Sequence, residues 1–89
     1  MSTVDPHYVC RVCGFLHDTP IWNDFGQSLL DESCICCGVY WGVDDTSLDE
    51  IRQYRMYWLA NGAKWKWPLV KPDDWELEEQ LTNIPRPFR

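Results

Sequence analysis

The sequence predicts one small α+β domain, and three observations lead to this fold class. The chain has 89 residues, which is the size of a single domain. Two Cys-x-x-Cys-Gly units, at 10–14 and 34–38, flank a segment that we interpret as a loop. Residues 47–60 have the apolar spacing of an amphipathic helix. We expect all 89 residues to form one domain, with a core at 8–62 and a C-terminal extension at 63–89.

The clearest predicted element is the helix at 47–60. Ser47 and Glu50 have the spacing of a capping box, in which the Ser hydroxyl accepts from one free N–H and the Glu side chain reaches back. Asn-Gly at 61–62 is typical of a helix end. A second, shorter helix is expected within 72–81, because a proline and acidic residues open that segment.

Two segments have strand patterns. Residues 38–43 are rich in β-prone side chains and are bounded by glycine. Within 63–69, every second residue from Trp65 to Leu69 is apolar, and Pro68 restricts such a strand to a sheet edge. We therefore expect a small β-sheet that has the cysteine units at the tips of its hairpins and the main helix packed on it.

Composition excludes several classes of protein. Apolar residues make up 45% of the chain and aromatic residues 15%, which is too apolar for intrinsic disorder. No apolar run reaches the ~20 residues of a membrane span, and the first residues lack the basic and apolar parts of a secretion signal. We expect a cytoplasmic protein whose core contains Trp22, Trp41 and Trp58. In that compartment, cysteines bind metal more often than they form disulfides.

The net charge narrows the possible partners. Eight basic and fourteen acidic residues give a formal charge of −6. An acidic chain is repelled by phosphate backbones, so generic binding to nucleic acid is disfavoured. Complementary charge accelerates association, and a basic protein partner is therefore favoured.

The spacing of Cys10, Cys13, Cys34 and Cys37 is that of a four-cysteine metal site. A glycine after each pair permits the left-handed turn that lets the pair wrap one side of a tetrahedral ion. We predict a structural zinc ion held by four thiolates at ~2.3 Å, with iron in the same ligand set as the alternative. Four cysteine ligands leave no open coordination position, and no catalytic motif is present, so we expect no enzymatic activity.

Three nearby residues are not expected to bind the metal. Cys36 is the fifth cysteine, and we interpret it as a free, partly buried, small hydrophobic residue. His7 and His17 lie close to the first cysteine pair in sequence. Because four cysteines already complete the ligand set, we interpret both histidines as loop residues.

Acidic and aromatic side chains are the candidates for a partner surface. The predicted contacts are Asp44, Asp45, Asp49, Glu50, Trp65 and Trp67. The acidic residues also suit the start of a helix, whose dipole they stabilise, and the two interpretations are compatible. Tryptophan is enriched among binding hot spots. A Lys-Trp-Lys-Trp stretch also suits stacking on single-stranded bases, which leaves a nucleic-acid-binding ribbon as an alternative.

The order of these motifs resembles the small bacterial cysteine-rich CPCC-type proteins, which look like short rubredoxin-like zinc ribbons. The resemblance covers about residues 8–62 and includes both cysteine units, Tyr40-Trp41, Asp44-Asp45, and Ser47–Glu50 followed by Arg52 and Tyr54. The chain has Arg11-Val12 where the family usually has a further cysteine and a proline. Some members resemble immunity proteins that are encoded beside secreted toxins. The resemblance therefore implies a zinc-stabilised protein-binding module that neutralises a basic toxin, with a rubredoxin-like electron carrier as the alternative.

Overall fold

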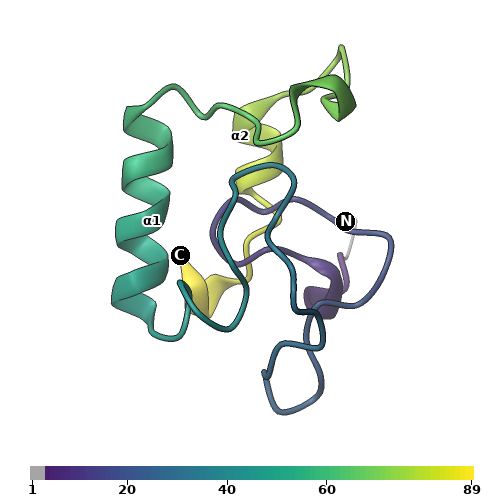
Figure 1. Cartoon of the computed structure of the whole chain (residues 1–89), viewed down its shortest axis with the longest axis vertical. Coiled ribbons are helices and arrows are strands. Elements are labelled where there is room, and N and C mark those ends of the chain that lie inside the picture. The colour runs from purple at the N-terminus through teal and green to yellow at the C-terminus, as the bar shows by residue number, and fades with distance from the viewer. Residues whose placement is uncertain (1–3) are drawn as a thin grey trace.

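The structure is a computed structural model, and it describes residues 4–89. Its helical elements are few and short: η1 (Pro6–Tyr8), α1 (Leu48–Ala60), η2 (Pro68–Val70), α2 (Leu77–Leu81) and η3 (Arg86–Phe88). Within the described residues there is no β-strand, and strand-like pairing is limited to three isolated bridges. The predicted α+β class with a small sheet is therefore wrong. Figure 1 shows α1 along one edge of a body that is made mostly of turns and loops, with the short α2 among them.

The predicted strand at 38–43 fails because the chain reverses too soon. Tyr40 forms a single antiparallel bridge with Ser33. Gly42 then takes a left-handed φ of 81°, and the amide of Asp44 donates back to the carbonyl of Tyr40 at 3.0 Å. One bridge followed by a turn cannot extend into a ladder. Gly42 therefore ends the strand pairing instead of forming the turn of a hairpin.

The predicted edge strand at 63–69 fails for a different reason. The consecutive amides of Lys66 and Trp67 donate to the consecutive carbonyls of Cys36 and Ile35, at 2.9 and 3.1 Å. A strand would point successive N–H groups to opposite sides. The segment instead lies irregularly along the second cysteine unit, and its last two residues, Pro68 and Leu69, already belong to η2.

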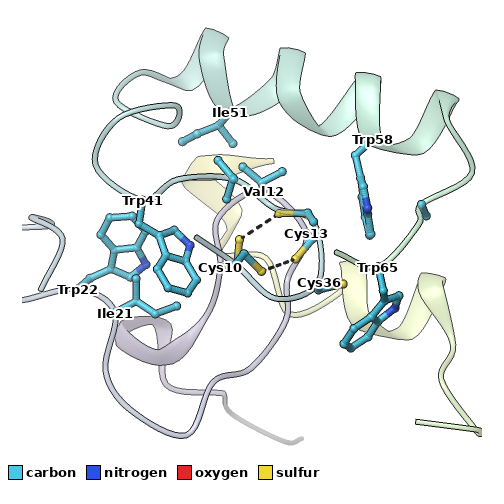
Figure 2. Packing of buried hydrophobic residues seen from close by; sticks show 14 residues of the cluster. Cys10, Val12, Cys13, Ile21, Trp22, Cys36, Trp41, Ile51, Trp58 and Trp65 are labelled. Carbon is cyan, nitrogen blue, oxygen red and sulfur yellow. Dashed lines mark hydrogen bonds between the residues drawn. The ribbon is translucent and has the colours of Figure 1, made fainter. Parts of the chain in front are cut away.

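Helix α1 confirms the strongest sequence prediction. Ser47 is its N-cap and accepts from the amide of Glu50 at 3.2 Å. The Glu50 carboxylate accepts from the amide of Thr46 at 3.1 Å, one residue before the position expected of a capping box. The helix buries Ile51 and Trp58. Its apolar stripe faces the cysteine cluster (Figure 2).

The second predicted helix is shorter than its sequence pattern. Residues 72–75 form a turn in which the amide of Trp75 donates to the carbonyl of Pro72 at 3.2 Å. Glu76 is extended and precedes α2 without a side-chain cap. The helix therefore begins only at Leu77, and it buries Gln80 toward the cysteines.

The core is built on cysteine and tryptophan. The predicted core residues Trp22, Trp41 and Trp58 are all buried, and Trp65 is buried with them. Figure 2 shows the cysteines at the centre of this cluster, with Trp22 and Trp41 on one side and Trp58 and Trp65 on the other. No helix within residues 4–89 has the length and apolar character needed to cross a membrane.

The N-terminal turn contains a titratable contact that predicts a pH effect on stability. His7 Nδ1 lies 2.9 Å from the Asp5 carboxylate, and its Nε2 lies 3.1 Å from that of Asp24. The hydrogen bond to Asp5, followed by the charges of both carboxylates, raises the pKa of His7 above its ordinary value. The protonated imidazole ties η1 to the loop at 23–27 across these two contacts.

A raised pKa means that this stabilisation is fully present below pH ~6.5 and is lost as the pH rises through the folded-state pKa. We expect His7→Gln to lower the melting temperature slightly at pH 5.5 and to leave it unchanged at pH 8.5. The measurement is the difference in melting temperature between the variant and the wild type at each pH, because that difference removes effects common to both. An equal difference at both pH values would show that the contact is not ionic.

Candidate metal centre

The four predicted ligand cysteines lie together and are all buried. Their Sγ atoms all lie within 4.8 Å of one another. Cys10 and Cys37 are 3.8 Å apart, and Cys13 and Cys34 are 3.7 Å apart. Four sulfurs at ~2.3 Å from a central ion would form a tetrahedron with edges of ~3.8 Å. The distances fit a tetrahedral ion and are far too long for a disulfide of ~2.05 Å.

The same backbone turn is used twice to build this site. We call residues 9–16 the first knuckle and residues 33–40 the second knuckle. In the first knuckle, Gly14 donates its amide to the carbonyl of Cys10 at 2.9 Å, and in the second, Gly38 donates to Cys34 at 2.9 Å. One bridge closes each turn, between Val9 and Leu16 and between Ser33 and Tyr40. The repeated Cys-x-x-Cys-Gly pattern therefore folds into two equivalent halves of one centre.

The two knuckle glycines differ in what surrounds them, and this gives a matched test. Both have left-handed φ values, 84° at Gly14 and 85° at Gly38. A Cβ on Gly14 would lie 2.2 Å from the Gln80 carbonyl oxygen, whereas one on Gly38 would lie 3.5 Å from the Tyr54 hydroxyl. We expect Gly38→Ala to cost ~1–2 kcal/mol of backbone strain. Gly14→Ala should cost more, because it also displaces α2.

Urea unfolding of the metal-loaded variants measures the two free energies. Gly62→Ala is the control, since its φ is 90° and no atom lies within 4 Å of the added Cβ. Equal losses at Gly14 and Gly38 would contradict the close packing of α2 on the first knuckle.

Side chains from both α-helices complete the backbone hydrogen bonding of the knuckles. Arg55 Nε donates to the carbonyl of Val12 at 2.7 Å, from the middle of α1. Gln80 Nε2 donates to the carbonyl of Cys13 at 3.0 Å, from α2. Neither residue could be assigned this role from the sequence, because nothing in the local pattern around Arg55 or Gln80 marks it as a contact of a distant turn.

Cys36 lies outside the four-sulfur group, although it is the neighbour of a ligand. It is fully buried, deeper than predicted, and its Sγ lies 3.4 Å from Gln80 Nε2. Its thiol contacts Gln80 of α2 and also lies beside the predicted ligand Cys13, without belonging to the four-sulfur group. The structure thus separates Cys36 from the predicted ligands Cys34 and Cys37 by geometry. In the sequence, only the spacing of the cysteines separated them.

His17 contacts the centre, whereas His7 does not. Its Nε2 lies 3.6 Å from Cys34 Sγ, and its ring packs edge-on against Phe15 and Trp41, at centroid distances of 4.7 and 4.8 Å. Burial lowers the pKa of His17, which favours the neutral ring near pH 7. A ring protonated at Nε2 donates to the sulfur and stabilises a thiolate there. The interpretation of His17 as an ordinary loop residue was incomplete.

The electrostatics of the four thiols favour a cation. Burial raises the pKa of Cys13 and of Cys37. At Cys10, burial acts in the same direction, but hydrogen bonds from three neighbouring sulfurs outweigh it and the pKa is well below its ordinary value. Four buried thiolates need a counter-charge, and a bound divalent ion supplies it while deprotonating the thiols. The donor set therefore fits a metal ion.

The predicted partner residues divide into exposed and buried groups. Asp44, Asp49, Glu50 and Trp67 are exposed. Asp45 is only 3% exposed and accepts from the Gly42 amide at 2.7 Å. Burial raises the pKa of Asp45.

Trp65 is 7% exposed and packs edge-on against Phe15 and Trp75, at centroid distances of 5.3 and 5.6 Å. Neither Asp45 nor Trp65 presents its side chain to a partner in this structure, because each is used inside the fold.

Comparison with protein-family models, curated proteins and solved structures finds no match to this chain. The described chain contains one group of side chains with the spacing of a metal centre, at Cys10, Cys13, Cys34 and Cys37. The conclusion that the sequence and the structure share is a small cysteine-rich domain with a four-cysteine candidate metal centre.

Proposed function

We propose that the protein is a zinc-stabilised, non-enzymatic module that binds another protein. The observation that supports this most directly is the burial of the four ligand cysteines: three of them are 0% exposed and Cys37 is 8% exposed. A metal bound by four buried thiolates has no free coordination position for a substrate. Such a metal stabilises the fold, and binding to a partner would then use residues on the protein surface.

Metal analysis tests the first half of this proposal. We expect one zinc ion per chain in colourless protein that is purified without added metal. One iron ion per chain, with the red colour of an Fe(Cys)4 centre, would replace the module with an electron carrier. Protein that folds with neither metal would contradict both.

The charge of the chain supports a basic partner. The formal charge is −6, and four thiolates with one dication would make it more negative. Exposed acidic residues at the start of α1, namely Asp44, Asp49 and Glu50, add to a field that attracts basic proteins. The resemblance described above favours a toxin as the partner, in which case the module is an immunity protein or antitoxin.

Co-expression with the product of the adjacent gene tests the second half. We expect the partner to co-purify with the protein and its toxicity to be suppressed. The double variant Asp44→Asn/Asp49→Asn should slow association, whereas Asp73→Asn/Glu78→Gln makes the same change in net charge at exposed residues outside the predicted surface and is the control. If the adjacent product neither binds nor loses toxicity, the proposed immunity function is wrong.

A further inference from the structure

A hollow in the surface lies beside α2. Its volume is ≈ 340 Å³, within the ~300–1,000 Å³ range of small-ligand sites. We call it the α2 groove. Its apolar walls are Phe15, Leu16, Pro72 and Trp75, and its rim includes Asp74, Glu76 and Glu79.

The aromatic wall of the α2 groove is connected to the cysteine cluster by packing and hydrogen bonds. Trp75 packs edge-on against Trp65, and its Nε1 donates to Gln80 Oε1 at 2.7 Å. Gln80 is bonded in turn to the backbone of Cys13. A wall fixed in this way is preorganised, so a ligand would not bear the cost of ordering it.

One cation of the chain already lies on this wall. The Lys71 ammonium is 5.0 Å from the centre of the Trp75 ring, a distance typical of a cation–π contact. Lys71 itself is exposed. Trp75 also lines the α2 groove, so its ring is accessible to a cation from outside the fold.

The rim of the groove has negative charge that is not neutralised by ion pairs. Asp74, Glu76 and Glu79 are exposed, and none of them forms an ion pair within residues 4–89. An aromatic wall beside uncompensated carboxylates is complementary to a side chain that has an apolar stem and a cationic end. Lysine and arginine are the side chains with that combination.

We propose that the α2 groove binds a lysine or arginine side chain of a basic protein partner. The stem packs on Phe15 and Leu16, the cationic end stacks on Trp75, and Asp74 and Glu79 neutralise it. Lys71 already contacts the Trp75 ring in the free protein and competes with the incoming cation for that ring. The assignment of the partner as a protein rests on the proposed function, whereas the chemistry of the groove does not.

The test uses the metal-loaded full chain and two tripeptide probes, Ac-Gly-Arg-Gly-NH2 and its neutral analogue with citrulline in place of arginine. Two-dimensional NMR follows the indole N–H of Trp75. We expect saturable shifts of that signal with the arginine peptide and none with the citrulline peptide. Equal shifts with both probes, or no shift with either, would overturn the proposal.

Matched variants separate the groove from the overall charge. Asp74→Asn/Glu79→Gln should lower the affinity for the arginine peptide by about fivefold or more, because both carboxylates lie at the groove. Asp73→Asn/Glu78→Gln changes the net charge equally at neighbouring residues outside the groove, and it should change the affinity less than about twofold. Equal weakening by the two pairs would mean that the peptide responds only to net charge.

A substitution of Lys71 tests the proposal through an expected gain in affinity instead of a loss. Lys71→Gln should raise the affinity for the arginine peptide by a few fold, because it removes the competing cation from Trp75. Lys64→Gln removes the same charge from an exposed residue that has no cation–π contact with Trp75, and it should have a smaller effect. Equal effects would contradict the competition.

The proposed function and this inference can fail separately. If the adjacent gene product binds the wild type and Asp74→Asn/Glu79→Gln equally well, the module binds a partner but the groove is not the contact. If that product does not bind while the arginine peptide still saturates the Trp75 signal, the groove recognises a cationic side chain and the proposed partner is wrong.

Discussion

Replacing Cys13 by serine is expected to abolish cooperative folding of the protein. Apparent binding free energies of structural zinc are ~10–16 kcal/mol at neutral pH, and this energy becomes folding energy. A chain of this size, with no strand in residues 4–89, has little else to replace it, since small cores rarely supply more than ~3–5 kcal/mol. The loss of one of four buried ligands, all within 4.8 Å of one another, should therefore unfold most of the molecule.

Circular dichroism and thermal melting check this expectation. Cys36→Ser is the matched control, because Cys36 is equally buried but lies outside the ligand group. We expect it to bind the metal in full and to lose about 1–2 kcal/mol through the polar hydroxyl that it buries. A strong chelator should reproduce the Cys13→Ser result in the wild type. Unchanged melting after complete removal of the metal would contradict a structural role.

Replacing Arg55 by methionine is expected to have the second largest effect, about 3–5 kcal/mol of unfolding free energy. The guanidinium donates to the carbonyls of Val12 and Arg11 at 2.7 and 2.8 Å, and to that of Phe88 at 2.5 Å. Hydrogen bonds that involve a charged group contribute ~1.5–3 kcal/mol each, and they do not add fully. Methionine retains an apolar stem but leaves these carbonyls without their donor.

Arg52→Met is the control for this variant. Arg52 lies on the same helix, but it makes one exposed contact, from Nε to the backbone oxygen of Arg89 at 3.0 Å. We expect it to cost less than about 1 kcal/mol. Urea unfolding of zinc-loaded protein measures both values, and zinc affinity should fall with Arg55→Met because the first knuckle loses its attachment to α1. Equal stability of the two variants would contradict the proposed attachment.

The candidate centre could be predicted from the sequence because its geometry is local. Two cysteines three residues apart, followed by a glycine, determine one turn wherever they occur. The two Cys-x-x-Cys-Gly units therefore predicted the four residues that the structure brings together, Cys10, Cys13, Cys34 and Cys37. The start of α1 was predictable for the same reason, since the contact between Ser47 and Glu50 spans three residues.

The sheet could not be predicted correctly because alternation of apolar residues does not show what a backbone is paired with. Trp65 points inward and Trp67 is 57% exposed, although both belong to the same apolar stripe in sequence. The local pattern was compatible with a strand, but the nearest partner was the second knuckle. Tertiary contacts determined the conformation of that segment.

The side-chain contacts around the centre could also not be predicted from the sequence. Arg55 and Gln80 are 43 and 67 residues from the carbonyls of Val12 and Cys13 that they bond. Asp45 belongs to an acidic run that suits a surface, yet its carboxylate binds the Gly42 amide inside the fold. Only the three-dimensional arrangement shows which polar side chains serve the interior.

The use of one turn twice has a consequence for the order in which backbone amides exchange with deuterium. In most domains the slowest exchange lies in sheets and long helices, where opening requires global unfolding. Here the amides of Cys10 and Cys34 are bonded inside the knuckles, at 3.0 and 2.8 Å, next to the buried sulfurs. With zinc bound, these loop amides should exchange more slowly than those of α1, so the most protected part of the protein would be the part without regular secondary structure.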